Sequence, residues 1–273
     1  MMKQWFEVAA GSIAGTKYRR QGINNQDAYY SRNGPEATVA VVCDGCGSGK
    51  HSEVGAKIGA RLVVEAIARL LPHQSHTASE FWELVRQEVL QGMKTLALNM
   101  GGDDNSVVKD IVYDYFLFTI VGALITPEGA TIFAKGDGVI FLNGEYIPLG
   151  PFANNAPPYL GYALISPESD RSLLEVCRSI PLEEVESILI GTDGVLDLMQ
   201  LSGKNFPGKT EPIGSISQFW QQDRYFQNPD MVRRQLSLIN RESSQINWEQ
   251  QEVNKQGGYL PDDTTLIAIR RCQ

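Results

Sequence analysis

The most constraining feature of the sequence is the stretch Val41-Val42-Cys43-Asp44-Gly45-Cys46-Gly47-Ser48-Gly49, in which a short β-type run ends at an aspartate and glycines follow. β-Branched residues favour a strand, and glycines allow the backbone behind it to turn sharply and to approach a ligand closely. A single Asp-Gly after a strand is usually an ordinary turn. The chain repeats the arrangement, however, at Gly136-Asp137-Gly138, Thr192-Asp193-Gly194 and Pro261-Asp262-Asp263-Thr264. We therefore expect strand ends to bring several carboxylates together at one site.

The composition indicates a large acidic protein with its own hydrophobic core. The chain has 273 residues, 42% of them hydrophobic, which is enough for a core that needs no disulfides. Its net charge of -8 and the lack of any basic run longer than Arg19-Arg20 or Arg270-Arg271 disfavour a nucleic-acid partner. The longest apolar run, residues 116–125, is far shorter than the roughly 20 residues of a membrane span. No sustained apolar stretch follows the N-terminus, so we expect a cytoplasmic monomer that binds no membrane.

Disulfides are not expected, because the chain has only four scattered cysteines: Cys43, Cys46, Cys177 and Cys272. Cys43-x-x-Cys46 resembles half of a zinc site. Its remaining ligands would have to be His73 and His76, at a separation that matches no standard zinc spacing. We therefore interpret Cys43 as a small buried strand residue and Cys46 as a loop residue beside the carboxylates.

The spacing of apolar residues predicts an α+β fold. Helical spacing occurs over residues 52–70, 79–101 and 231–239, and we extend it to 243–253. β-Type runs are expected at residues 6–10, 26–30, 37–43, 116–125, 130–135, 139–142, 146–147, 173–179, 187–192 and 265–269. We interpret residues 116–147 as one antiparallel meander, 11–25 as a loop and 150–172 as a long irregular excursion. Grouped antiparallel strands with helices between the groups fit α+β layers better than βαβ units.

Asp27, at the start of a β-type run, joins the strand-end aspartates as a candidate site residue. Carboxylates gathered without cations repel one another and raise their own pKa values, so the cluster implies bound cations. Oxygen ligands select the hard ions Mg²⁺ or Mn²⁺ rather than zinc. Two such ions about 3.5 to 4 Å apart can hold and acidify a shared water and clamp phosphoryl oxygens. The residues therefore indicate hydrolysis of a phosphate ester without a covalent enzyme intermediate.

This ordered set resembles the metal-dependent serine/threonine protein phosphatases, the PPM or type 2C family, and most of all its compact bacterial branch. The resemblance runs from about residue 11 to 270 and is carried by Gln26-Asp27-Ala28, Asp44-Gly45, Gly136-Asp137, Thr192-Asp193-Gly194-Val195-Leu196-Asp197 and Asp262-Asp263-Thr264-Thr265. It implies a four-layer αββα sandwich, in which two antiparallel β-sheets are flanked by helix pairs. It also implies that residues 1–273 form a single catalytic domain, with a flap-like insertion at 150–172 beside the active site.

The resemblance assigns a role to each aspartate. Asp44 would bridge two metal ions, the carbonyl of Gly45 and Asp27, the latter through water, would serve one ion, and Asp193 and Asp262 would serve the other. Asp44, Asp193 and Asp262 are then the catalytic residues. The residues of a weaker third-metal site would be Asp137, Asp193 and Asp197.

Three positions depart from the family's pattern. Gly22 stands where relatives commonly place a phosphate-binding Arg, so the candidates for that role are Lys17, Arg19 and Arg20. Gln26 replaces a frequent Glu, which makes one water-mediated metal contact neutral or removes it. Cys46 stands where eukaryotic members have a His general acid, which leaves Cys46 and the nearby His51 as candidates for protonating the leaving group.

We therefore expect a Mg²⁺- or Mn²⁺-dependent protein phosphatase that hydrolyses phosphoserine and phosphothreonine on a protein substrate and opposes a serine/threonine kinase in signalling. Gly22 and Gln26 keep a second hypothesis open, that of a phosphatase-like phosphoprotein-binding or sensing module with little turnover. A third hypothesis is a small-molecule phosphohydrolase, although the chain has no P-loop or dinucleotide fingerprint.

Overall fold

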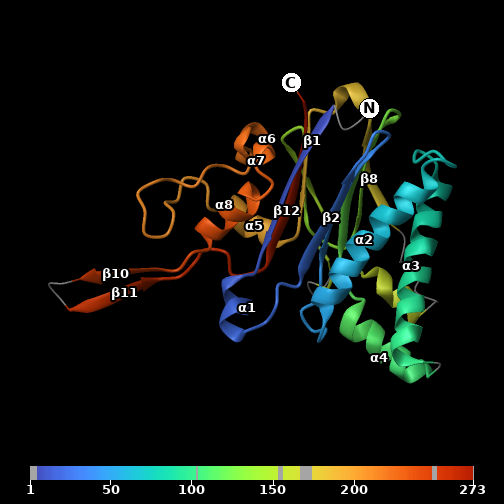
Figure 1. Ribbon diagram of the computed structural model, residues 1–273, viewed down its shortest axis with the longest axis horizontal. Coiled ribbons are helices and arrows are strands. Elements are labelled where there is room, and N and C mark those ends of the chain that lie inside the picture. Colours follow the sequence, from blue (N-terminus) through green and yellow to red (C-terminus); the bar gives the residue numbers. More distant parts are fainter. Residues whose placement is uncertain (1–4, 103, 153–155, 167–173, 248–250, 273) are drawn as a thin grey trace.

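The computed structural model describes residues 5–102, 104–152, 156–166, 174–247 and 251–272, and it contains two five-stranded sheets that pack face to face (Figure 1). All strand pairs within them are antiparallel. The first sheet has the order β1 (Phe6–Ile13), β12 (Thr264–Arg271), β9 (Ser187–Gly191), β6 (Val139–Leu142) and β7 (Glu145–Pro148). The second has the order β2 (Asp27–Asn33), β3 (Thr38–Asp44), β4 (Ile120–Thr126), β5 (Gly129–Lys135) and β8 (Glu175–Ile180).

Helices cover the outer faces of both sheets, so the expected four-layer α+β sandwich is confirmed. The second sheet is covered by α2 (Ser52–Leu70), α3 (Ser79–Gly101) and α4 (Asn105–Tyr115). The first is covered by α5 (Gly194–Met199), α6 (Gln218–Gln221), α7 (Arg224–Gln227) and α8 (Met231–Ile239). In the described part of the chain, no helix combines the length and the apolar character that crossing a bilayer requires.

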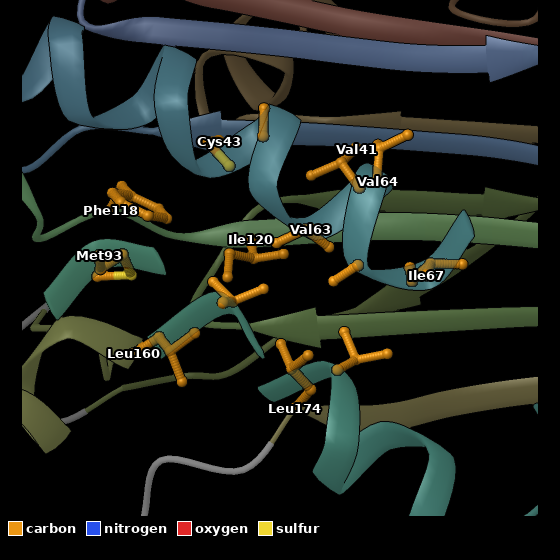
Figure 2. Close-up of a cluster of buried hydrophobic side chains, with 14 of the residues drawn as sticks. Val41, Cys43, Val63, Val64, Ile67, Met93, Phe118, Ile120, Leu160 and Leu174 are labelled. Atoms are coloured by element: carbon orange, nitrogen blue, oxygen red, sulfur yellow. The ribbon is translucent and has the colours of Figure 1, made fainter. Parts of the chain in front are cut away.

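Three apolar clusters fill the spaces between the four layers. Val42 and Ile267 belong to the cluster between the two sheets. Figure 2 shows the cluster between the second sheet and its helices, where Ile67 of α2 and Phe118 are fully buried or nearly so. Leu236 of α8 lies in the third cluster, on the outer face of the first sheet. Full burial of each such side chain stabilises the fold by about 1.5–3 kcal/mol.

The alternation of side chains along β3 decides where Asp44 lies. Val41 and Cys43 belong to the cluster beneath the helices, whereas Ala40 and Val42 belong to the cluster between the sheets. Since successive side chains of a strand point to opposite faces, Asp44 lies on the inter-sheet side, at the end of the strand. The sandwich thus directs this carboxylate towards the other sheet.

The expected meander over residues 116–147 is wrong at its middle. β4 begins at Ile120 and pairs with β5 in the second sheet, but β6 and β7 belong to the first, so the chain changes sheets at Gly136-Asp137-Gly138. Gly136 has a φ of 97°, a conformation that favours glycine. Strands buried on both faces give continuous apolar runs, and such runs do not distinguish a hairpin from a crossover. The hairpin predicted at Asn143-Gly144 is confirmed, with Leu142 opposite Glu145.

Two further expectations are corrected by the structure. Residues 11–25 are not all loop, because they contain the end of β1 and the helix α1 (Thr16–Gln21), which is too short for an apolar period to be visible. The described part of residues 243–253 is not helical, because β10 (Ser243–Asn247) and β11 (Glu252–Gln256) form a two-stranded ribbon that extends away from the sandwich (Figure 1). Ser and Asn disfavour helix interiors, and cross-strand pairing satisfies their backbone groups. The sequence prediction also missed α4, although Asp104 caps it by accepting a hydrogen bond from the Ser106 N–H.

The irregular excursion over residues 150–172 contains one short 3₁₀ helix, η3 (Leu160–Leu164), and a second such turn, η4 (Leu182–Glu184), precedes β9. Leu160 is fully buried in the cluster beneath the helices. Residues 153–155 and 167–172 of the excursion lie outside the described residues.

Candidate metal centre

The second sheet contributes two aspartates to one end of the sandwich. Asp27 and Asp44 are the terminal cross-strand pair of β2 and β3. Directly opposite residues of an antiparallel pair have adjacent side chains on one face of the sheet. The prediction that these strands bring Asp27 near Asp44 is therefore confirmed.

The first sheet places three more aspartates at one end of its strands. Gly191, at the end of β9, pairs with Val139 of β6 and with Leu266 of β12. Asp193 follows β9, whereas Asp137 and Asp262 precede β6 and β12. Because β9 is antiparallel to both β6 and β12, it ends at the same end of the sheet at which β6 and β12 begin. All three aspartates therefore lie at this end, although they are far apart in sequence.

The carboxylates lie close enough to raise one another's pKa values. Burial raises the pKa of Asp44 well above its usual value, and Asp27, Asp193, Asp262 and Asp137 raise it further. Burial also raises the pKa of Asp193 to about 6, with Asp262 and then Asp137 adding to the effect. Four aspartates from both sheets therefore act on Asp44. The sequence prediction of an acid cluster centred on this residue agrees with this arrangement.

Asp137 and Asp197 lie at the periphery of the cluster. Burial raises the pKa of Asp137, and burial followed by the charge of Asp262 raises that of Asp197. Asp197 lies in α5, one turn after Asp193, which is the residue that precedes the helix. Residues four positions apart lie on the same face of a helix, so this spacing brings the two carboxylates to one side of α5.

Asp27 is the most deeply buried of these aspartates. Its Oδ2 accepts a hydrogen bond of 2.7 Å from the Thr192 hydroxyl, whereas its buried Oδ1 has no hydrogen-bond partner among the described residues. Burial raises its pKa, the Thr192 hydrogen bond opposes this, and the charges of Asp263 and Asp193 raise it again. A buried carboxylate oxygen without a partner is costly, and a cation or a cation-bound water would satisfy it.

Gly45 lies where the backbone approaches other segments closely. A Cβ at this position would come within 2.8 Å of the Ser52 carbonyl oxygen and 2.9 Å of the Gln26 carbonyl oxygen. The Gln26 side chain is buried, and its amide donates a hydrogen bond of 2.8 Å to the Ser52 hydroxyl. Gln26 thus fastens β2 to the first residue of α2.

Asp263 is a positioning residue that the sequence prediction missed. Its two carboxylate oxygens accept hydrogen bonds from the backbone N–H groups of Gly15, at 2.7 Å, and Gln26, at 2.6 Å. One side chain therefore fastens the segment before β12 to the segments before α1 and β2. The Asp262-Asp263 pair was visible in the sequence, but its second member has partners more than 230 residues away.

The two candidate general acids lie in different surroundings. The Cys46 sulfur lies 3.2 Å from the Ser48 hydroxyl oxygen. Burial raises the pKa of the Cys46 thiol, but hydrogen bonds from Ser48, Tyr159 and Gly49 outweigh this effect, so the pKa lies below its usual value. The hydroxyl of Tyr159 also faces Asp44 and Asp137, which places the thiol at the edge of the cluster.

His51 is exposed, and its ring packs 4.8 Å from that of Tyr115 at the end of α4. This packing directs the ring towards the helices. Of the two candidates, Cys46 is therefore the one that the structure brings to the carboxylates.

The three basic candidates for phosphate binding also differ in the contacts that their side chains make. The Arg19 guanidinium donates to the Asn240 carbonyl at 2.9 Å, and that of Arg20 pairs with Glu242 at 3.2 Å, so both side chains turn towards the segment before β10. Lys17 is exposed, and its ammonium lies 5.4 Å from the ring centre of Tyr18. Of the three, Lys17 is the one that makes no ion pair or side-chain hydrogen bond among the described residues, and it lies next to a tyrosine that the sequence prediction did not consider.

In the parts of the chain that the structure describes, no group of three or more His, Cys, Asp or Glu side chains is already arranged to hold a metal ion. His76, considered as a zinc ligand, has both ring nitrogens hydrogen-bonded to Thr131 and Thr126, at 3.0 and 2.8 Å. Cys43 is fully buried, and burial, followed by the charges of Asp27 and Asp44, raises the pKa of its thiol.

An antiparallel αββα sandwich with carboxylates gathered at one end of its two sheets matches known proteins. The family model described as Protein phosphatase 2C matches residues 14–234. This match spans most of the chain, which therefore belongs to the protein phosphatase 2C family, and the resemblance inferred from the motifs is confirmed. No curated protein gives a significant match.

Two solved structures with TM-scores above 0.5 agree with this fold, and a third is reported beside them. A bacterial serine phosphatase, solved as a mutant, is 14% identical with a TM-score of 0.52, over 98% of this chain and 99% of that one. PppA of Pseudomonas aeruginosa, described as a key regulatory component of T6SS, is 14% identical with a TM-score of 0.54, over 98% of both chains. The catalytic domain of the serine/threonine phosphatase PstP, solved with two manganese ions, is 15% identical with a TM-score of 0.46, over 98% and 99%.

Proposed function

We propose that this protein is a Mg²⁺- or Mn²⁺-dependent phosphatase that hydrolyses phosphoserine and phosphothreonine on proteins. The observation that carries the proposal is the hydrogen bond from Thr192, next to Asp193, to Asp27, the cross-strand partner of Asp44, because it gathers carboxylates from both sheets at one end of the sandwich. Such a cluster is costly unless cations neutralise it. Family membership supports a phosphate ester as the substrate.

The residues present fit hard divalent ions. All candidate ligands are oxygen atoms, and the buried Oδ1 of Asp27 has no partner among the described residues. Asp44, Asp193 and Asp262, with Asp27 and the Gly45 carbonyl, would hold two ions, and Asp137 and Asp197 would contribute to a third. When bound, such ions supply an acidified water and clamp the phosphoryl oxygens.

The remaining steps fall to side chains around the cluster. The Cys46 thiol is the candidate for protonating the leaving oxygen, because it lies two residues after Asp44 and its pKa is below its usual value. Asp27 and Thr192 join the two sheets at the site and maintain the spacing of the carboxylates. We assign residues 1–273 to one catalytic domain, and we assign the segment 150–172, which contains Tyr159, to a flap-like insertion of that domain.

We propose that the partner is a phosphorylated protein substrate. The phosphatase would oppose the serine/threonine kinase that phosphorylates this substrate. The similarity to PppA, a key regulatory component of T6SS, supports a place in signalling for this chain.

The test is phosphate release from a phosphoserine or phosphothreonine peptide and from p-nitrophenyl phosphate, with and without Mn²⁺. We expect turnover that depends on Mn²⁺ and is abolished in Asp193→Asn. Metal-independent turnover, or full activity of the variant, would contradict the proposal. Nucleotides and sugar phosphates in the same panel test for a small-molecule phosphohydrolase.

A second candidate function is a phosphoprotein-binding module with little turnover. Two residues favour it. The neutral side chain of Gln26 is hydrogen-bonded to Ser52, and the exposed Gly22 stands where relatives commonly have a phosphate-binding arginine. Calorimetry separates the two functions. Tight phosphopeptide binding in saturating Mn²⁺ without phosphate release favours the module.

A further inference from the structure

Helix α1 is fastened to the segment that carries Asp262. The backbone N–H groups of Thr16 and Lys17 donate to the carbonyls of Leu260 and Pro261, at 2.9 and 3.1 Å. Just before the helix, a Cβ at Gly15 would come within 2.3 Å of the Pro261 carbonyl oxygen, which shows how closely the two backbones meet. The first turn of α1 is therefore held in a fixed position relative to the acid cluster.

This fixed helix brings the Tyr18 hydroxyl to the glycine-rich loop behind Asp44. A Cβ at Gly47, three residues after Asp44, would lie 3.5 Å from the Tyr18 hydroxyl oxygen. The side chain thus extends from the segment beside Asp262 to the glycine-rich loop behind Asp44. Burial raises the pKa of Tyr18 to about 12, with contributions from Asp262, Asp263, Asp44 and Asp193. Carboxylates from both sheets therefore face the phenol.

The Tyr18 hydroxyl is available as a hydrogen-bond donor. Among the described residues it has no hydrogen-bond partner. A phosphoryl group held by cations still has oxygens that accept hydrogen bonds, and a phenol that stays protonated at neutral pH can donate one. Of the basic candidates on α1, Arg19 and Arg20 are engaged with Asn240 and Glu242, and the Lys17 ammonium lies 5.4 Å from the ring centre of Tyr18 itself.

We propose that the Tyr18 hydroxyl donates a hydrogen bond to the phosphoryl group of the substrate and takes the place of the cation missing at Gly22. The inference rests on the proposed function, because it concerns how that site holds its phosphate ester. It makes Tyr18 a substrate-binding residue and gives the site a neutral donor.

The experiment uses inorganic phosphate as the probe, so that binding is measured apart from turnover. Calorimetry gives the dissociation constants for phosphate in saturating Mn²⁺ and for Mn²⁺ alone, in the wild type and in Tyr18→Phe. We expect Tyr18→Phe to weaken phosphate binding about tenfold, the usual effect of losing one hydrogen bond to a charged group, and to raise KM for p-nitrophenyl phosphate similarly. The Mn²⁺ dissociation constant should stay within about twofold, because the phenol is not assigned to the metal.

The matched control is Tyr146→Phe, which removes a hydroxyl from an exposed tyrosine on β7 and should change none of these values. Unchanged phosphate affinity in Tyr18→Phe would overturn the inference, as would a loss of Mn²⁺ affinity with phosphate affinity intact, or a wild type that binds no phosphate. A wild type that binds phosphate but releases none from any phosphate ester would overturn the proposed function alone. In that case the two dissociation constants still decide the role of Tyr18.

Discussion

Asp27 and Thr192 form a hydrogen bond of 2.7 Å that joins the two sheets at the end where the carboxylates gather. Asp27 begins β2 in one sheet, and Thr192 follows β9 in the other. The Thr192 hydroxyl also accepts from the Thr265 N–H at 3.1 Å, so the contact includes the start of β12. Three segments that carry candidate ligands are thus held by one hydroxyl group.

Replacing Thr192 by Val should destabilise the protein by about 1–3 kcal/mol, because it leaves buried polar groups of Asp27 and Thr265 without their partner. Urea unfolding at pH 7 measures the difference in the free energy of unfolding. Thr192→Ser keeps the hydroxyl and serves as the control. If the valine variant is as stable as the serine variant, the hydrogen bond does not contribute to the free energy of unfolding.

The metal-free protein should lose stability as the pH rises from about 4 to 6. The pKa of Asp193 is raised from 3.8 to about 6 in the folded state, so the native state binds the proton more tightly and is favoured below the lower value. This stabilisation is lost as the pH rises through the folded pKa. With EDTA present, Asp193→Asn, which has no such proton to lose, should therefore exceed the wild type by roughly 1–3 kcal/mol above pH 6. The difference should shrink towards pH 4, and a difference independent of pH would contradict the assignment.

Gly45→Ala should lower activity and Mn²⁺ affinity together, because a Cβ would meet backbone oxygens of Ser52 and Gln26 at 2.8 and 2.9 Å and displace the Gly45 carbonyl. We expect at least a tenfold loss in kcat/KM, on the order of 1.4 kcal/mol. Gly34→Ala is the control, since its Cβ would meet nothing closer than 3.5 Å. Equal activity of the two variants would argue against Gly45 as a ligand position.

The double variant Arg19→Ala with Arg20→Ala should leave KM within about twofold of the wild type, because both guanidinium groups are engaged with the segment before β10 and exposed ion pairs contribute little. Steady-state kinetics with p-nitrophenyl phosphate measures this value. A tenfold rise in KM would restore the hypothesis that these arginines reach the phosphate.

The aspartates could be predicted from the sequence because each follows or precedes an apolar run, and strand ends collect at sheet edges. Asp44 needed only the alternation of β3 and the glycines behind it. The exchange of sheets at Asp137 could not be predicted in the same way, because strands buried on both faces look alike whether they continue a hairpin or cross over.

Tyr18, Thr192 and Asp263 escaped the sequence prediction for another reason. Their roles depend on contacts between segments far apart in the chain, such as the hydrogen bond from the Gly15 N–H to Asp263 across 248 positions. Helix α1 is also too short to show a period. If the helix is not predicted, the orientation of Tyr18 cannot be predicted either. The sequence prediction therefore assigned phosphate binding to the neighbouring basic residues instead.

The most direct test of the acid cluster as a binuclear metal centre is a calorimetric titration of the wild type and Asp44→Asn with Mn²⁺. We expect the wild type to bind at least two ions and Asp44→Asn to lose affinity for both, because the carboxylate proposed to bridge the ions would serve both. A wild type that binds no Mn²⁺, or an Asp44→Asn variant that binds the same number of ions with the same affinity, would contradict the account.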